Sequence, residues 1–349
     1  MRAVVKYAPG HGHIELRDVP EPEVGAGEVK IRVKAVGICG SDLHIFTGDI
    51  GIPTKIPFTI GHEFSGTVAA VGTQVSRFKP GDRVTAENSR LTCGRCRYCL
   101  TGDYNLCPDR LATGYAFDGA YADFCVVPEK RVHLLPQGVD FLTAALTDPS
   151  ACVYHAVQDL TGVQAGDTVL ITGCGAMGLF SVQYVKANGG TAIVTGLPQD
   201  AKRLKLAGEL GADSTVNGSE QDIETVVMDL TRGSGADIAL ECSGSQAGAA
   251  SCLKLLRRQG KYTQIGIFGK PVSLDLDRVL YGEIRMTGSF SQKNLAWQAA
   301  LDLAAQGKIV ARPLITDILP LESWEEGFER SFSGQAVKVV FDPEMPPQA

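Results

Sequence analysis

Alternating apolar and polar positions mark the first part of the chain. In residues 28–36 (EVKIRVKAV) Val, Ile and Val alternate with Lys and Arg, which predicts a strand with one buried face. Short strands are also predicted at residues 66–72 and 81–87, which both begin with glycine. Over residues 141–157 the pattern becomes helical, and Pro149 is expected to begin a second helix. We expect this part to be mostly β-structure with irregular loops.

The middle of the chain alternates strand-like and helix-length runs. The predicted strands lie at residues 167–173, 191–196, 213–217, 236–244 and 260–269. The predicted helices between them lie at residues 175–188, 200–211, 219–232 and 245–260. This repeated β-then-α order predicts an α/β fold in which helices cover both faces of a parallel sheet. Two more helices, residues 294–307 and 321–332, and a last strand, residues 336–341, are expected near the end.

Composition narrows the class of protein. A length of 349 residues suggests two domains, and 44% hydrophobic with 21% charged residues is ordinary for a globular protein. The net charge of −6 argues against nucleic acid or an anionic membrane surface as the main partner. No apolar run has membrane-spanning length, and the first residues lack the apolar core of a signal peptide. We therefore expect a cytoplasmic protein without a membrane partner.

A glycine motif predicts a dinucleotide site. Gly173, Gly175 and Gly178 form GxGxxG directly after a predicted strand and at the beginning of a predicted helix. The first glycine permits a tight turn, the second a close approach of the backbone to a pyrophosphate, and the third close packing of helix on strand. The helix beginning at Ala176 and Met177 would offer its free N–H groups and positive dipole end to the phosphates.

The choice between NAD and NADP depends on the residue at the end of the strand that follows the glycine motif and its helix. An acid about 20 residues after the glycines usually binds the ribose 2′-OH, but Gly196 stands there in this sequence. Without the acid a 2′-phosphate is not repelled, and Lys202 and Arg203 could pair with it. The alternative is that both are solvated charges at the beginning of a helix. The pattern favours NADP and leaves NAD open.

Four of the ten cysteines lie within fifteen residues. Cys93, Cys96, Cys99 and Cys107 have the spacing C-x2-C-x2-C-x7-C, in which neighbouring thiolates can reach one tetrahedral ion. Four thiolates leave zinc no open position, so we expect a structural zinc that holds an irregular lobe of about residues 88–110 together. An iron–sulfur cluster is the alternative.

Three further segments carry mixed metal ligands. Catalytic zinc takes about three protein ligands and keeps a position for water or substrate. Cys39, His62 and an acid, either Asp148 or Glu63, supply such a set. Taken alone, Cys39 would be a small buried side chain, His62 a hydrogen-bonded core histidine, and Asp148 a helix N-cap. Together with a dinucleotide motif, they indicate a catalytic zinc site.

The sequence resembles a known family. The segment GHEFSG at residues 61–66, the four-cysteine lobe and GxGxxG follow one another as in the zinc-containing medium-chain dehydrogenase/reductases, near the alcohol, sorbitol and threonine dehydrogenases. The resemblance covers nearly the whole chain. It implies a GroES-like, mostly β catalytic domain of residues 1–152 and 290–349. Into it is inserted a Rossmann domain, a doubly wound parallel sheet, of residues 153–289.

The resemblance also implies roles for single residues. Cys39, His62 and Asp148 would hold the catalytic zinc, with Glu63 as an alternate ligand or a residue beside it. Polyol dehydrogenases of the family usually have Glu-Pro where this chain has Asp148-Pro149, so direct ligation by the shorter side chain stays open.

Three more roles concern the proton and the cofactor. The resemblance implies that Ser41 takes the proton of the alcohol and that His44 passes it to solvent. Lys338, in the last predicted strand, would reach the cofactor phosphates.

The resulting expectation is a homodimeric or homotetrameric enzyme with two zinc ions per chain. It would transfer a hydride between NAD(P) and a small secondary alcohol or polyol. One alternative is a metal-free quinone or enone reductase of the same fold, which the joint presence of Cys39, His62 and Asp148 disfavours. Another is a non-enzymatic module whose four cysteines form a nucleic-acid-binding zinc element. It would need a basic face, whereas 39 acidic residues outnumber 33 basic ones.

Overall fold

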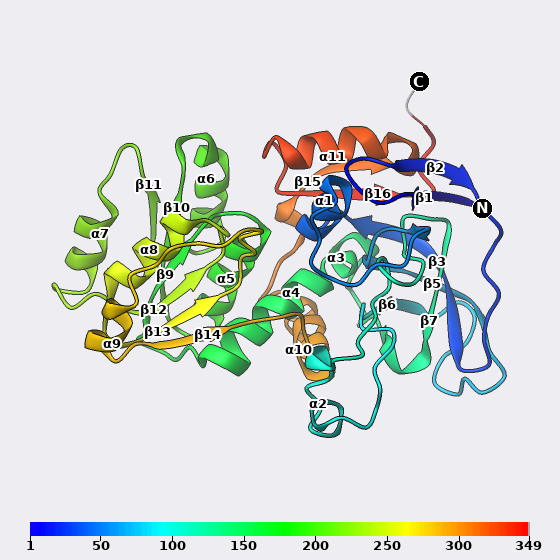
Figure 1. Cartoon of the computed structure of the whole chain (residues 1–349), viewed down its shortest axis with the longest axis horizontal. Coiled ribbons are helices and arrows are strands. Elements are labelled where there is room, and N and C mark those ends of the chain that lie inside the picture. Colours follow the sequence, from blue (N-terminus) through cyan, green and yellow to red (C-terminus); the bar gives the residue numbers. More distant parts are fainter. Residues whose placement is uncertain (348–349) are drawn as a thin grey trace. The chain divides into compact units, whose positions relative to one another are not determined.

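A computed structural model describes residues 1–347 and divides the chain into two compact units (Figure 1). The first, here the β unit, comprises Met1–Asp148, Gln292–Gln306 and the described residues from Ala311 onward. The second, here the α/β unit, comprises Pro149–Ser291 and Gly307–Val310. Within residues 1–347, none of the helices combines enough length and enough apolar residues to span a bilayer.

A seven-stranded sheet forms the centre of the β unit, in the order β15-β16-β3-β5-β6-β8 with β7 paired to β3. Along β3 the side chains of Val29, Ile31 and Val33 are buried and Arg32 is exposed, which confirms the predicted alternation. The strands are β3 (Glu28–Gly37), β5 (Glu63–Val71), β6 (Arg83–Ala86), β7 (Phe124–Pro128), β8 (Val132–Leu134), β15 (Ile315–Pro320) and β16 (Lys338–Asp342).

A smaller sheet and short helices complete the β unit. The sheet has the order β2-β1-β4, with β1 at Arg2–Lys6, β2 at Ile14–Asp18 and β4 at Phe58–Thr59. The helices are α1 (Gly40–Thr47), α2 (Arg97–Leu100), α3 (Phe141–Ala145), α10 (Asn294–Ala305) and α11 (Trp324–Phe332). The first and last parts of the chain thus build one unit, since β16 pairs with β3.

The α/β unit contains a six-stranded, all-parallel sheet in the order β11-β10-β9-β12-β13-β14 (Figure 1). This is the strand order of a doubly wound Rossmann sheet, so the predicted fold class is confirmed. The strands are β9 (Thr168–Thr172), β10 (Thr191–Gly196), β11 (Ser214–Asn217), β12 (Ala236–Glu241), β13 (Leu256–Gln264) and β14 (Arg285–Gly288).

The helices of the α/β unit follow its strands. They are α5 (Ala176–Ala187), α6 (Ala201–Glu209), α7 (Ile223–Leu230), α8 (Gln246–Leu255) and α9 (Asp277–Gly282). The helix predicted to run to residue 260 ends at Leu255 instead. Leu256 pairs with Ala236 of β12, so sheet pairing overrides the helical preference of the following residues.

The helical region after α3 also differs from its prediction. Helix α4 spans Thr147–Tyr154 and a π-helical turn follows at His155–Thr161. Pro149 was expected to begin the second helix, but it lies in the first turn of α4. That position suits proline because the first-turn N–H groups have no partner within the helix.

Candidate active site

The end of β3 and the beginning of α1 position a cysteine. Cys39 is the N-cap residue of α1, and its backbone N–H donates to Asp42 Oδ2 at 2.9 Å. This is the reciprocal half of a capping box, in which a third-position acid reaches back to the N-cap. The thiol is therefore held at the point where the chain leaves the sheet. Asp42 itself is fully buried.

A glycine determines where the next ligand lies. Gly61 has φ +91°, and a Cβ there would come within 2.2 Å of the Tyr121 ring, so only glycine fits. The following residue, His62, is 2% exposed. Its Nδ1 lies 3.5 Å from Asp42 Oδ1, and both atoms are buried without a hydrogen-bond partner among the described residues. Asp42 Oδ2 accepts a hydrogen bond from Tyr121 (2.8 Å).

One ligand atom each of Cys39, His62 and Glu63 lies within 4.8 Å of the others. A thiol, an imidazole and a carboxylate at this separation fit a zinc ion. The orphaned Nδ1 of His62 beside Asp42 fits the same assignment, because metal-bound histidines usually direct their other ring nitrogen at a carboxylate. In the sequence, the available signal for Asp42 is its spacing of three residues from Cys39.

Glu63 forms a buried ion pair with Lys338. Lys338 Nζ donates to both carboxylate oxygens of Glu63, at 2.7 and 2.5 Å, and to Ile38 O at 2.8 Å. The ammonium group of Lys338 is thus buried and bound to Glu63, and its predicted contact with cofactor phosphates stays a prediction. Burial has the largest single effect and lowers the pKa of Lys338. The charges of Glu63, Cys39 and Asp42, together with the hydrogen bond to Glu63, outweigh burial and raise the pKa. Pairing of β16 with β3 brings the two together.

Asp148 lies near this cluster, within the electrostatic influence of His62 and Glu63. Its carboxylate is 4% exposed and accepts a hydrogen bond from Gln292 Nε2 at Oδ2 (2.8 Å). Burial raises the pKa of Asp148 to about 6, against the opposing charge of His62. The three mutually close ligand residues include Glu63 in its place. Direct ligation by Asp148 stays a prediction.

Ser41 and His44 have separate partners. Ser41 Oγ lies 2.6 Å from Tyr115 OH, whereas His44 Nδ1 lies 3.1 Å from Asp49 Oδ1. The structure thus places no direct hydrogen bond between the two members of the predicted relay among the described residues. Tyr115 was missed because it lies 74 residues from Ser41 in an irregular loop that carries no motif.

The four cysteines of the lobe come together. Their four Sγ atoms all lie within 4.8 Å of one another, and those of Cys93 and Cys99 are 3.9 Å apart. Backbone N–H groups donate to the sulfurs, for example Cys96 N to Cys93 Sγ at 3.3 Å. Hydrogen bonds from the backbone of Arg95 and Cys96 lower the pKa of Cys93 to about 7. Such a set of thiols fits zinc with no open position.

The glycine loop of the α/β unit joins β9 to α5 and shows why two of its glycines are required. At Gly173 φ is +91°, and a Cβ would meet the Ser243 backbone at 2.9 Å. At Gly178 a Cβ would come within 1.9 Å of Gly173 O. Gly175 is the N-cap of α5 and has open space around it. The free N–H groups of the first turn, which begins at Ala176, suit a phosphate.

A carboxylate that sequence analysis passed over lies beside Gly196. A Cβ at Gly196 would be 3.1 Å from Asp200 Cβ. Asp200 Oδ1 lies 3.2 Å from Arg203 Nη1, and Oδ2 accepts from the Leu197 N–H (3.0 Å). Arg203, proposed from the sequence as a phosphate partner, is therefore already paired with an acid, whereas the neighbouring Lys202 is exposed.

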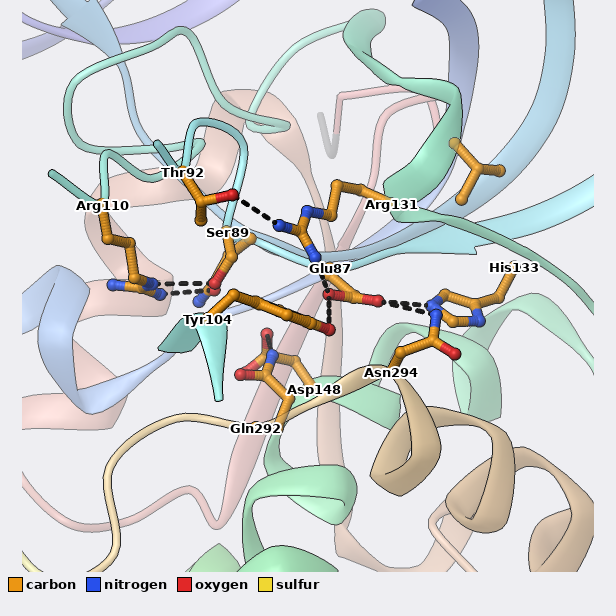
Figure 2. A network of polar contacts seen from close by, with 12 residues as sticks. Glu87, Ser89, Thr92, Tyr104, Arg110, Arg131, His133, Asp148, Gln292 and Asn294 are labelled. Carbon is orange, nitrogen blue, oxygen red and sulfur yellow. Dashed lines mark hydrogen bonds and ion pairs between the residues drawn. The ribbon is translucent and has the colours of Figure 1, made fainter. Parts of the chain in front are cut away.

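A buried polar network surrounds Glu87, which follows β6 (Figure 2). Glu87 is 1% exposed, and its carboxylate accepts hydrogen bonds from four side chains. These are Tyr104 at 2.6 Å, His133 at 2.9 Å, Arg131 at 3.1 Å and Asn294 at 3.3 Å. No sequence motif marks these residues, because they come from four separate segments, of which one carries both Arg131 and His133.

Arg110 extends the network shown in Figure 2. Three residues after Cys107, it donates to Ser89 Oγ and to Asn88 Oδ1, both at 2.8 Å. Its positive charge also opposes the rise in the pKa of Asp148 that burial causes. Residues 87–89, which follow β6, thus contact Tyr104 and Arg110 in the later part of the lobe.

Comparisons with known proteins cover both units. The family model of the alcohol dehydrogenase GroES-like domain matches residues 25–137, and that of the zinc-binding dehydrogenases matches residues 176–306. The chain is 42% identical to a sorbitol dehydrogenase of Halalkalibacterium halodurans, across 98% of this chain and 99% of that one. It is 39% identical to a D-arabitol-phosphate dehydrogenase of Enterococcus avium, across 98% and 97%.

A solved structure is similar over the same extent. It is that of a zinc-binding dehydrogenase from Sinorhizobium meliloti 1021 bound to NADP, with a TM-score of 0.90 and 32% identity. The similarity covers 98% of this chain and 99% of that one.

Proposed function

This chain belongs to the zinc-containing medium-chain dehydrogenase/reductase family and is an NAD(P)-linked oxidoreductase of alcohols or polyols, and we propose that its substrate is a small polyol or secondary alcohol. The observation that carries the proposal is the cluster of Cys39, His62 and Glu63, whose ligand atoms lie within 4.8 Å of one another. The sorbitol and arabitol-phosphate dehydrogenases to which the chain is similar support a polyol.

Residues of the β unit would perform the polar part of the reaction. Cys39 and His62, with a carboxylate of Glu63 or Asp148, would hold zinc, which supplies Lewis-acid polarisation of an alcohol or carbonyl oxygen when bound. Asp42 orients the imidazole of His62 through its position beside Nδ1.

Ser41 is the proposed proton acceptor for the substrate hydroxyl. It is 8% exposed, and its Oγ is held by Tyr115 OH at 2.6 Å, which orients the hydroxyl group. His44, 3.1 Å from Asp49, is the proposed group from which the proton leaves to solvent. Any connection from Ser41 to His44 would then run through a rearranged side chain or a water molecule.

The glycine loop and the beginning of α5 would bind the pyrophosphate of the nucleotide, which supplies hydride chemistry when bound. We propose NADP as the preferred nucleotide, supported by Gly196 in place of an acid and by Lys202 and Arg203 nearby. Asp200 opposes this preference, because it pairs with Arg203 and adds a negative charge. The preference between NADP and NAD therefore depends on how strongly Asp200 repels the 2′-phosphate of NADP.

A second zinc ion, bound by Cys93, Cys96, Cys99 and Cys107, is proposed to have a structural role. The four thiols leave no position for substrate. None of the ten cysteines forms a disulfide bond in the structure, which supports a reducing compartment such as the cytoplasm.

We further propose a homo-oligomer. Strand β14 is the edge of the six-stranded sheet, and apolar side chains near it are exposed: Leu276 (61%), Leu280 (68%) and Met286 (41%). Sedimentation of Met286→Lys against the unaltered protein tests this, because a charge at this edge should favour the monomer.

The central experiment combines a substrate panel with metal analysis. Polyols, simple secondary alcohols and the amino alcohol threonine are offered with NAD and with NADP. We expect two zinc ions per chain and reduction of nucleotide with at least one alcohol. The proposal fails if no alcohol is oxidised, or if enzyme stripped of zinc at the Cys39 cluster turns over as fast as the intact enzyme.

A further inference from the structure

Gln292 contacts the carboxylate beside the metal cluster. Gln292 lies just before the N-cap of α10 and is 1% exposed, and its Nε2 donates to Asp148 Oδ2 at 2.8 Å (Figure 2). Water does not replace a hydrogen bond at this depth, so losing the amide leaves the carboxylate oxygen with one partner fewer. The orientation of Asp148 is therefore controlled from a segment 144 residues away in sequence.

The next residue, Lys293, contacts the four-cysteine lobe. Lys293 is the N-cap of α10, and its Nζ lies 3.0 Å from Asp103 Oδ1. Asp103 lies between Cys99 and Cys107 along the chain, immediately before the short helical turn that leads to Cys107. The pair is partly exposed, with 26% and 39% of its side chains accessible, so by itself it contributes little stability. Its significance is its position next to Gln292.

Asn294, the first residue of α10, contacts the lobe through a buried carboxylate. Asn294 Nδ2 donates to Glu87 Oε1 (3.3 Å), and Tyr104 OH, within the lobe, donates to Glu87 Oε2 (2.6 Å). Glu87 is 1% exposed, so both hydrogen bonds form away from water. Of three consecutive residues, Gln292 thus contacts the carboxylate beside the metal cluster, Lys293 contacts the lobe, and Asn294 reaches the lobe through Glu87.

We propose that residues 292–294 are a positioning segment that fixes Asp148 with respect to the four-cysteine lobe, so that the lobe influences catalysis without touching substrate or cofactor. The inference rests on the proposed function, because it assigns Asp148 to the surroundings of a catalytic metal. Its physical basis is that Gln292, Lys293 and Asn294 are consecutive and each is held by a polar contact, so that a shift of one contact strains its neighbours. A displacement of the lobe at Asp103 or Glu87 moves the backbone that carries Gln292.

Two tyrosines of the lobe make the test specific. Tyr104→Phe removes the hydroxyl that donates to Glu87 and retains the ring. Tyr98→Phe is the matched control, because the ring of Tyr98 lies against Arg97 (5.5 Å from the guanidinium carbon to the ring centroid) rather than against Glu87. Gln292→Met keeps the length of the side chain and removes the amide.

Each full-length, zinc-loaded variant is measured for kcat, for KM, for the zinc affinity of the Cys39–His62 cluster by chelator competition, and for thermal unfolding. Gln292→Met and Tyr104→Phe should each lower kcat and zinc affinity about tenfold and leave the KM for nucleotide unchanged. Tyr98→Phe should change none of these. The double variant should match Gln292→Met alone, because both changes act along one path.

The proposal is overturned if Tyr104→Phe lowers only the melting temperature, or if the two effects multiply in the double variant. Failure of the proposed function has a different signature. In that case wild-type protein with two zinc ions would oxidise no alcohol with either nucleotide, while the zinc-affinity comparison would still decide whether Tyr104 and Gln292 act on the metal cluster.

Discussion

Lys338 and Glu63 form an ion pair that is almost closed to solvent. The two side chains are 6% and 1% exposed, and Nζ lies 2.5 Å from Oε2. Glu63 directly follows His62, so the pair sets the charge beside the proposed metal cluster. Breaking a buried pair leaves an uncompensated charge, which costs more than the intact pair contributes.

Lys338→Met should therefore lower the free energy of unfolding by about 3 kcal/mol, as expected when one partner of a buried pair is removed. Denaturant unfolding with unchanged m-value measures this. The control is Lys254→Met, which removes an exposed pair with Glu224 (64% and 44% exposed) and should leave unfolding unchanged. Equal effects of the two substitutions would contradict the burial argument.

Cys39→Ala should abolish turnover and spare nucleotide binding. Loss of the thiolate removes Lewis-acid polarisation, so kcat/KM should fall at least about 10³-fold, which corresponds to about 4 kcal/mol of transition-state stabilisation. Titration of nucleotide fluorescence should give an unchanged Kd, because the glycine loop lies in the other unit.

Cys125→Ala is the control for this substitution, since Cys125 is buried in β7 and belongs to neither ligand cluster. Metal analysis should find one zinc ion fewer only in Cys39→Ala. Full activity of Cys39→Ala without that zinc would refute the assignment of the cluster.

Asp200→Ala should shift the enzyme toward NADP. The substitution removes a negative charge and releases Arg203 Nη1 from its contact at 3.2 Å. One additional charge-assisted hydrogen bond to a 2′-phosphate, about 1.5 kcal/mol, would raise the NADP-to-NAD ratio of kcat/KM about tenfold.

Arg203→Ala should lower the same ratio, and Lys205→Ala, an exposed cation two residues further along α6, should leave it unchanged. If Arg203→Ala and Asp200→Ala shifted the NADP-to-NAD ratio of kcat/KM in the same direction, the Asp200–Arg203 pair would not determine the nucleotide preference.

Glu87 should contribute stability that depends on pH. Burial alone would raise the pKa of Glu87, but the hydrogen bond and charge of His133 and the charge of Arg131 outweigh it, so the pKa lies below 4.5. A carboxylate with a lowered pKa stabilises the fold above its unfolded pKa, and this stability is lost as the pH falls through the folded value.

At pH 7, Glu87→Gln should therefore lower the free energy of unfolding by about 2 kcal/mol, and the difference from wild type should narrow as the pH falls below 4.5. Unfolding curves from pH 7 to pH 3 measure the difference. The control Glu325→Gln changes an exposed acid and should give a curve parallel to that of wild type. If the difference in free energy of unfolding between wild type and Glu87→Gln widened at low pH, the pKa of Glu87 would not be lowered.

The sequence by itself determined the features that depend on neighbouring residues. The turn at Gly173 and the close approach at Gly178 follow from φ and from distances within six residues, so GxGxxG after a strand predicted them. In the same way, the spacing of Cys93, Cys96 and Cys99 brought three sulfurs together through local backbone geometry. The repeated β-then-α order predicted the parallel sheet.

Only the tertiary structure decided which distant side chains meet. Pairing of β16 with β3 brings Lys338 to Glu63 across 275 residues, and no local pattern of residues predicted this ion pair beside the metal cluster. The beginning of α10 likewise brings Gln292 to Asp148 across 144 residues. Such contacts depend on strand register and helix placement, which are set by burial of the whole core, and no local pattern of residue types encodes them.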